Sequence, residues 1–187
     1  MTTATPDRAA AVRSALRRLV ADHGLHGASM AAVAKEAGVA TGTAYVHYTS
    51  KDELLLAAYL ELKVDLGRAA VDGLNRSAPA EARFTSMWRA VHGFLAADPT
   101  RARFLTQVES SPLAAAAHGA ALAAGHDPVL DEAAASDLAD RLRPLPPEVL
   151  WDLGFGPAVR LVASGRPLDD AGLASLADAC WQAITEA

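Results

Sequence analysis

Apolar residues recur every three or four positions along most of this 187-residue chain, which is the spacing of one face of an α-helix. Over residues 7–23 the pattern runs through Val12, Leu16 and Val20 before Gly24 supplies a stop. Runs that alternate apolar and polar residues, as half-buried strands do, are missing. The pattern predicts an all-α protein with about nine helices.

Two short helices are predicted next, with a tight turn between them. Ser29 is a natural N-cap for a helix over residues 30–37. Gly38 can end that helix, because glycine adopts a left-handed backbone conformation at little cost. A second short helix is predicted over about residues 40–48.

The remaining three quarters of the chain are predicted to form mostly longer helices divided by prolines and glycines. Ser50 and Glu53 form a capping-box pattern at the start of a long helix that is expected to reach about residue 75. The later helices are predicted over residues 81–97, 100–109, 128–142, 148–163 and 171–185, with an alanine-rich stretch at 113–126 that the pattern leaves ambiguous.

Residues 29–51 have the arrangement of a helix-turn-helix, in which one short helix crosses the DNA backbone and the next lies in the major groove. The small side chain of Ala34 allows the two helices to approach closely, and Val39 is expected to be a buried plug in the turn. Thr41, Gly42 and Thr43 open the second helix, whose first backbone amides would point toward phosphate. The arrangement predicts a DNA-binding segment.

The charge distribution favours the same end of the chain. The net charge is −5, but residues 1–51 carry six basic and three acidic side chains, a net of +3, whereas the remainder has a net of −8. A basic head on an acidic body is the asymmetry expected if only the head meets nucleic acid. Taken alone this is a weak signal, since a short segment reaches +3 by chance.

The same stretch resembles the DNA-binding domain of the TetR family, whose pattern is roughly S/T-x-x-x-I-A-x-x-A-G-V-S-x-G-T-L-Y-x-H-F-x-S-K-x-x-L. The matching residues, within about residues 8–55, are Ser29, Val33, Ala34, Ala37, Gly38, Val39, Thr41, Gly42, Thr43, Tyr45, His47, Tyr48, Ser50, Lys51 and Leu54. Tyr48 stands where the family has Phe, so its hydroxyl needs a partner or an outlet to solvent. The resemblance implies a three-helix DNA-binding domain over residues 1–50 and a helical domain for ligand binding and dimerisation over residues 51–187.

The resemblance also implies a set of DNA-contacting residues, namely Ser29, Thr41, Gly42, Thr43, Tyr45, His47 and Lys51. Most of them would meet phosphates, whereas Thr43 would face the groove and His47 would reach a phosphate or a base edge. Three alternatives stay open: Ser29 as a helix cap only, Thr43 as a solvated surface residue, and Lys51 as an ordinary surface lysine. The second short helix has no Arg, Asn or Gln, the side chains that read guanine or adenine bidentately. We therefore expect phosphate contacts to supply much of the affinity, with modest discrimination per half-site.

For the C-terminal part, the resemblance implies a small-molecule effector site and a homodimer formed through the last two helices, about residues 148–163 and 171–185. Residues 103–112 resemble a stretch found in one branch of the family. The candidate effector-pocket residues are Trp88, His92, Phe104, Gln107 and Trp151. Trp88 and His92 are four apart and share a helix face. The alternative is that the tryptophans fill the core and His92 is held by a hydrogen bond.

The function that these patterns predict is a ligand-responsive transcriptional regulator, most simply a repressor released from a palindromic double-stranded DNA operator by a small molecule. A TetR-type activator and a helical adaptor without DNA binding are the alternatives. An enzyme is not expected, because no HExxH, GxSxG, Walker A or GxGxxG motif is present. No cofactor or metal site is predicted, and one cysteine allows no intrachain disulfide. No signal peptide or 18-residue apolar run occurs, so we expect a soluble cytoplasmic protein.

Overall fold

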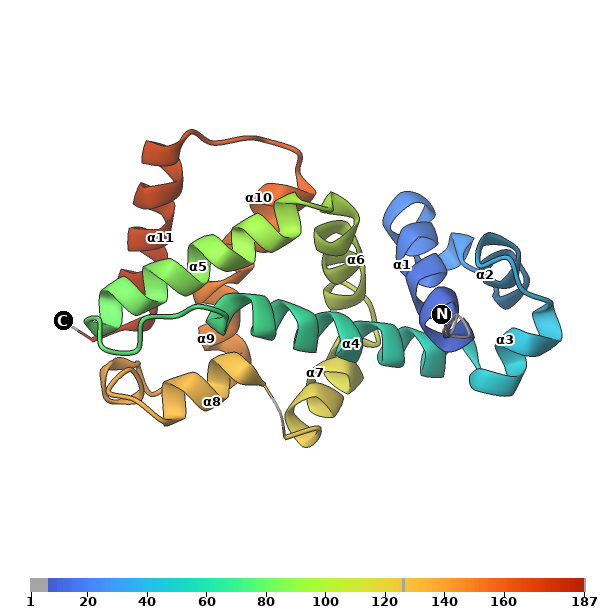
Figure 1. Ribbon diagram of the computed structural model, residues 1–187, viewed down its shortest axis with the longest axis horizontal. Coiled ribbons are helices and arrows are strands. Elements are labelled where there is room, and N and C mark those ends of the chain that lie inside the picture. Colours follow the sequence, from blue (N-terminus) through green and yellow to red (C-terminus); the bar gives the residue numbers. More distant parts are fainter. Residues whose placement is uncertain (1–6, 126, 187) are drawn as a thin grey trace, which may run out of the picture.

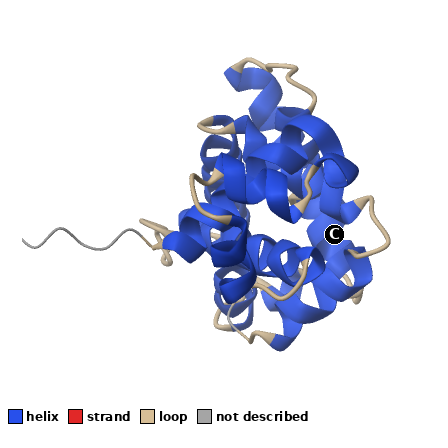
Figure 2. Ribbon diagram, turned by 90° about the vertical axis from the view of Figure 1, so that its right-hand side faces the viewer, coloured by secondary structure: helices blue, strands red, loops and turns tan. Residues whose placement is uncertain are grey.

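The computed structural model describes residues 7–125 and 127–186, and within these ranges the chain forms eleven α-helices and no strand (Figures 1 and 2). In chain order the helices are α1 (Arg8–Gly27), α2 (Met30–Glu36), α3 (Thr41–His47), α4 (Lys51–Val71), α5 (Ala80–Ala96), α6 (Pro99–Glu109), α7 (Ala114–Ala123), α8 (Pro128–Ala134), the 3₁₀ helix η1 (Ala139–Arg141), α9 (Pro147–Gly154), α10 (Gly156–Ala163) and α11 (Asp170–Ile184). The all-α prediction is confirmed. The expected number, about nine, is wrong.

Helix α4 connects the two ends of the molecule. Helices α1, α2 and α3 form a small head at one end, and α4 runs from this head into the larger body formed by α5 to α11 (Figure 1). Helix α1 packs on both α4 and α6, so the head also contacts the body directly. A movement of α4 in the body therefore has a direct path to the head.

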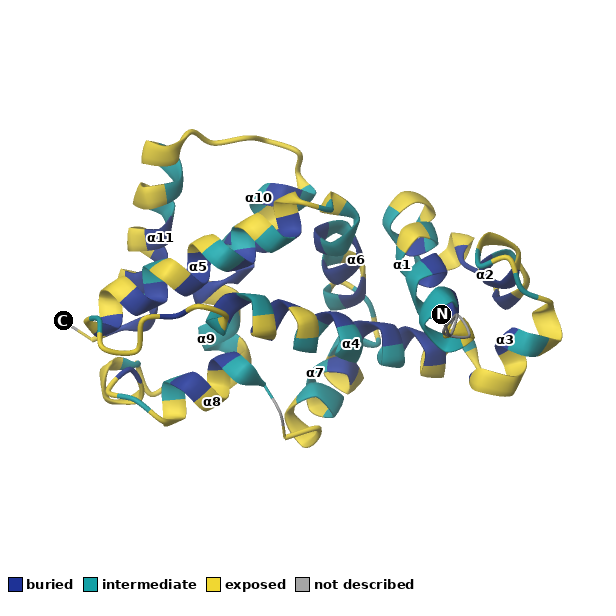
Figure 3. Ribbon diagram, viewed as in Figure 1, coloured by how far each residue is buried: buried dark blue, intermediate teal, exposed yellow. Residues whose placement is uncertain are grey.

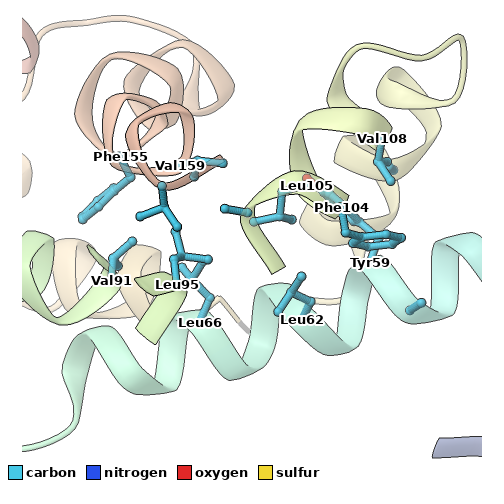
Figure 4. Close-up of a cluster of buried hydrophobic side chains, with 14 of the residues drawn as sticks. Tyr59, Leu62, Leu66, Val91, Leu95, Phe104, Leu105, Val108, Phe155 and Val159 are labelled. Carbon is cyan, nitrogen blue, oxygen red and sulfur yellow. The ribbon is translucent and has the colours of Figure 1, made fainter. Parts of the chain in front are cut away.

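The body is held together by apolar side chains from four helices. Leu62 and Leu66 of α4 lie beneath Leu95 of α5, beside Leu105 of α6 and close to Val159 of α10 (Figure 4). All five are buried, none more than 2% exposed. Truncating a leucine in such a position costs about 2–5 kcal/mol, because a cavity remains where the side chain was. The core thus fixes α4 against the helices that surround it.

Two glycines shape the ends of α1 and α4. Gly24 has φ +70° and interrupts the regular helix of α1, as the sequence predicted. Gly73 has φ +68° and follows the last turn of α4, which ends at Val71 rather than near residue 75. Both angles lie in the left-handed region that only glycine enters at low cost. The long helix is therefore shorter than the apolar pattern indicated.

The helix predicted over residues 148–163 is wrong as a single element. It is two helices, α9 and α10, that meet at Phe155. Pro157 explains the break: its ring nitrogen has no hydrogen to donate, and the ring clashes with the carbonyl of Leu153 one turn earlier. The apolar spacing continues through the break, which is why the pattern did not reveal it.

The helix predicted over residues 128–142 is also wrong in its second half. Helix α8 ends at Ala134, and only η1 follows. The Ser136 hydroxyl donates to the carbonyl of Glu132 and accepts from the amide of Leu138, at 2.9 and 3.3 Å. Such local bonds between side chain and backbone compete with the helical ladder. The chain turns there instead of continuing.

No helix in the described part of the chain is both long enough and apolar enough to cross a membrane.

Candidate nucleic-acid interface and body cleft

Helices α2 and α3 and the turn between them form the predicted helix-turn-helix. The Ser29 hydroxyl accepts a hydrogen bond from the Ala32 amide at 3.2 Å, which caps α2. Gly38 in the turn has φ +68°. The amide of Val39 donates to the carbonyl of Ala34 at 3.0 Å, and Ala34 is fully buried. The small residue at position 34 thus lies where the two helices are packed most closely.

Most of the predicted DNA-contacting residues are exposed, and α3 carries much exposed backbone in Figure 3. The exposed members are Ser29, Thr41, Gly42, Tyr45 and His47, and Thr43 is half-buried. Tyr45 has 51% of its surface exposed, which is unusual for a large aromatic residue without a partner. A Cβ built on Gly42 would meet no atom within 4 Å. The fold of this chain therefore does not itself require glycine at position 42.

Lys51 and Tyr48 are held by the protein itself. The Lys51 ammonium donates to the carbonyl of Leu25 at 3.1 Å and is half-buried. Tyr48 is buried, and its phenolic oxygen accepts from Arg13 at 2.6 Å, which is the partner that the sequence required. Lys51 thus has a structural bond as well as two further N–H groups for an outside partner.

Two residues that the sequence analysis did not single out join this surface. Val46 in α3 is 82% exposed, next to Tyr45. Arg8, at the start of α1, shares a polar hollow with Gly38, Ala40 and Thr43 at the start of α3. Val46 could have been found in the sequence, because it is an apolar residue between Tyr45 and His47 on a short helix. Arg8 entered the charge count, but only the fold brings it to α3.

Several arginines of the basic head are paired inside the protein. Arg13 donates to one oxygen of Glu61 at 2.6 Å, and Arg17 binds the other. Arg18 pairs with Glu36 at 3.0 Å. Because Glu61 is on α4, the first two pairs fasten α1 to the helix that leads into the body. Three of the basic side chains of the head therefore form ion pairs within the protein and do not contribute to a free cationic surface.

The body contains a cleft between α4, α7, the start of α8 and α9, which we call the α4–α9 cleft. It encloses about 500 Å³, including space open to solvent, and it is mainly apolar. Its lining residues are Tyr59, Lys63, His118, Ala121, Leu122, Asp127, Leu130, Pro147, Glu148 and Trp151. Its mainly apolar lining with a few polar groups is the composition that small-molecule sites share.

Lys63 is the basic group of the α4–α9 cleft. Its ammonium nitrogen lies 3.1 Å from the centre of the Trp151 ring, in a cation–π contact. Burial lowers the pKa of Lys63 to about 8, although the carboxylates of Asp127, Glu109 and Asp152 act in the opposite direction. Burial likewise raises the pKa of Glu109, which favours its neutral form.

The five predicted effector-pocket residues do not come together. Trp151 lines the α4–α9 cleft, whereas Trp88 and Phe104 are fully buried in the core. His92 stacks on Trp88 with ring centres 5.9 Å apart, so these two do share a helix face. Gln107 is exposed, with its amide oxygen near Gly24. The cleft residues on α4 and α7 carry no sequence motif, and only packing reveals them.

The described residues contain no cluster of three or more His, Cys, Asp or Glu side chains arranged to hold a metal ion.

Two family models match the chain. The model for bacterial regulatory proteins of the tetR family matches residues 12–58, which include the helix-turn-helix. The model for the tetracyclin repressor-like C-terminal domain matches residues 79–185, more than half of the chain. This chain belongs to the TetR family of transcriptional regulators. TetR proteins are DNA-binding regulators, and the tetR-family model covers most of the head described above.

Related proteins agree with this assignment. An uncharacterised HTH-type transcriptional regulator from Haemophilus influenzae is 36% identical over 113 residues, a match that spans 60% of this chain and 60% of that regulator. The crystal structure of a TetR-family regulator from the same organism superposes with a TM-score of 0.76 at 27% identity, covering 96% of this chain and 97% of the other. Both are similar in kind to this TetR protein.

A more distant structure shares the fold alone. FadR from Bacillus subtilis, solved in complex with stearoyl-CoA, superposes with a TM-score of 0.67 at 19% identity, covering 92% of this chain and 95% of FadR.

Proposed function

We propose that this TetR-family regulator is a repressor that binds a palindromic operator as a homodimer and leaves it when a small molecule binds the body. The observation that carries the DNA part is the exposed surface of α3, where Tyr45 and His47 are exposed and neither side chain makes a hydrogen bond within the described residues. Ser29, Thr41 and Gly42 border this surface. Exposed hydroxyl and backbone groups suit phosphate contacts, which position a protein on DNA.

The contact set consists of Ser29, Thr41, Gly42, Thr43, Tyr45, His47 and Lys51, with Arg8 and Val46 added. Gly42 supports close approach of the backbone to DNA, since its side of α3 is open. Lys51 holds Leu25 and offers its remaining N–H groups to a phosphate. The Ser29 hydroxyl accepts from the Ala32 amide as a cap, and its O–H donates to a phosphate oxygen. The unit that meets DNA would be residues 1–50, and residues 51–187 would respond to ligand.

The coupling we propose is a shift between two populations. The ligand-free dimer holds its recognition helices at a spacing that fits the operator, and the effector binds better to a different spacing. Helix α4 supports this coupling, because Lys63 faces the α4–α9 cleft while Glu61, two residues earlier, binds α1 of the head. Stearoyl-CoA in FadR is a precedent for a ligand in this fold.

A gel shift with DNA from the protein's own promoter tests the DNA part. We expect specific binding with a two-fold symmetric footprint, and an affinity that falls steeply as salt rises, because phosphate contacts release counterions. The Tyr45→Phe variant should bind the same DNA more weakly. Binding that ignores sequence, or no binding at all, would overturn the proposal. A reporter gene under the same promoter then gives the sign of regulation: higher expression without the protein indicates repression, and lower expression indicates activation.

A further inference from the structure

The α4–α9 cleft has one feature that its apolar walls do not explain, the ammonium group of Lys63. Lys63 makes a cation–π contact with the Trp151 ring, and within the described residues no carboxylate oxygen lies within 4 Å of its nitrogen. An ammonium has three N–H donors, and buried donors normally find acceptors. A half-buried lysine without them carries an energetic cost that a bound acceptor would relieve.

The acidic groups near Lys63 are engaged or unsuited to act as that acceptor. Asp127, at the start of α8, uses one carboxylate oxygen to cap the helix through the amides of Val129 and Leu130, at 2.9 and 3.3 Å. Glu109 on α6 has one buried oxygen without a partner in the described residues, and burial favours its neutral form. Asp152 on α9 is exposed to water. None of the three forms an ion pair with Lys63.

The other polar groups facing Lys63 are neutral donors or lie at the rim. Burial raises the pKa of Tyr59, so its phenol stays protonated. His118 on α7 lies tilted against the Tyr59 ring, with centres 6.3 Å apart. The indole N–H of Trp151 is buried and has no acceptor in the described residues. Glu148 is exposed. Beside Lys63 the cleft therefore offers hydrogen-bond donors from Tyr59 and Trp151, next to the apolar side chains of Ala121, Leu122 and Leu130.

We infer that the α4–α9 cleft binds a molecule with an apolar body and a terminal carboxylate, which accepts hydrogen bonds from Lys63. This inference rests on the proposed function, because it names the chemical class of the effector. A carboxylate supplies the hydrogen-bond acceptors that Lys63 lacks, and its negative charge strengthens those bonds. A cationic ligand would meet a like charge at the inner end of the cleft, and the face of Trp151 is already occupied by the lysine. An alcohol would supply an acceptor but no charge.

The test uses three probes with the same tail and different head groups: decanoate, 1-decanol and decyltrimethylammonium. Binding is measured by calorimetry and by tryptophan fluorescence, since Trp151 is in the cleft. We expect decanoate to bind at least tenfold more tightly than decanol, and decyltrimethylammonium to bind most weakly. Lys63→Met should remove the preference for decanoate, and Lys63→Arg should retain it. Arg68→Met is the matched control, because Arg68 is an exposed cation on the same helix that does not line the cleft.

Each result has a defined consequence. The proposed ligand class would be wrong if decanol bound as tightly as decanoate, if decyltrimethylammonium bound more tightly, or if decanoate did not bind. It would also be wrong if Lys63→Met still preferred decanoate over decanol. The promoter gel shift is run on the same preparation without any probe. A protein that shifts its promoter but ignores decanoate refutes this inference and leaves the DNA proposal intact. A protein that binds decanoate through Lys63 but shifts no DNA supports the cleft and refutes the proposed function.

Discussion

The guanidinium of Arg13 donates a 2.6 Å hydrogen bond to the phenolic oxygen of Tyr48, residues that are 35 positions apart in the chain. The TetR-family pattern has Phe at this position, and the change to Tyr comes with a charged partner on α1. Because Arg13 also binds Glu61, the bond joins the end of α3 to both α1 and α4. The orientation of the recognition helix thus depends on a polar cluster at the base of the head.

The Tyr48→Phe variant should be less stable than the wild type by about 1–2 kcal/mol, since it loses a buried hydrogen bond to a charged group. Urea unfolding followed by circular dichroism measures this difference. Tyr45→Phe is the matched control: Tyr45 is exposed, so its unfolding free energy should stay within about 0.5 kcal/mol of the wild type while DNA binding weakens. Equal stability loss in both variants would contradict this assignment.

The Glu61→Gln variant should destabilise the protein at neutral pH, because Arg13 and Arg17 lose their shared carboxylate. Burial acts to raise the pKa of Glu61, but the two arginines lower it below the value of an unfolded chain. The stabilisation is therefore present above the unfolded pKa and is lost as the pH falls through the folded one. The difference in unfolding free energy between the wild type and Glu61→Gln should be smaller at pH 3 than at pH 7. An equal difference at both pH values would refute the ion-pair explanation.

The Val46→Ala variant should fold normally and read DNA differently. Val46 is 82% exposed, so little stability depends on it, and an apolar side chain on a recognition helix contacts thymine methyl groups. Gel shifts on an operator in which single thymines are replaced by uracil should reveal a position at which the wild type loses affinity and the variant does not. If both proteins respond alike at every position, Val46 does not read a methyl group.

The Lys63→Met variant should be more stable than the wild type at pH 7, because a charged lysine in this cleft is poorly hydrated. Burial lowers the folded pKa to about 8, so between that pH and the unfolded pKa the unfolded chain binds more protons than the folded one. Wild-type stability should therefore rise relative to the variant as the pH is raised from 8 to 10. Urea unfolding at pH 7 and pH 9.5 measures the difference in unfolding free energy between the variant and the wild type. This difference should shrink at the higher pH, and an increase would contradict the explanation.

The Leu153→Asp variant should weaken self-association if α9, α10 and α11 form the dimer seam. Leu153 and Leu168 are leucines with 39% and 43% of their surface exposed, and apolar groups at the surface of a protein often mark an interface. Sedimentation velocity should show a dimer for the wild type and more monomer for the variant. Leu122→Asp, on α7, changes another exposed leucine outside this region and should leave the dimer intact.

The helix-turn-helix was readable from the sequence because its determinants are local. Ser29 caps the helix that directly follows it, and Gly38 turns the chain where it stands. Pro157 also acts locally, but the helix break at this residue is hidden in the sequence pattern because apolar residues continue at helical spacing on both sides. The Ser136 turn also broke a predicted helix, and its cause, a pair of bonds to neighbouring backbone, is invisible to a periodicity argument.

The candidate effector site was much harder to predict from the sequence. Of the predicted pocket residues, Trp88 and Phe104 are in the core, and aromatic character by itself does not tell a wall of a cleft from the interior. No sequence motif marks Lys63, because single lysines are common on amphipathic helices. Its environment is unusual only because Trp151, 88 positions later, lies against it.

By itself, the sequence determined the helical class, the DNA-binding segment and the family, because helix spacing, caps and the motif at residues 29–51 act over a few neighbouring positions. Only the tertiary structure decided that Arg13 and Arg17 bind Glu61 of α4, so that they join the head to the body. It also decided that Lys63 lies in an apolar cleft without a carboxylate partner. Charge and burial depend on residues far apart in the chain, and packing alone brings those residues together.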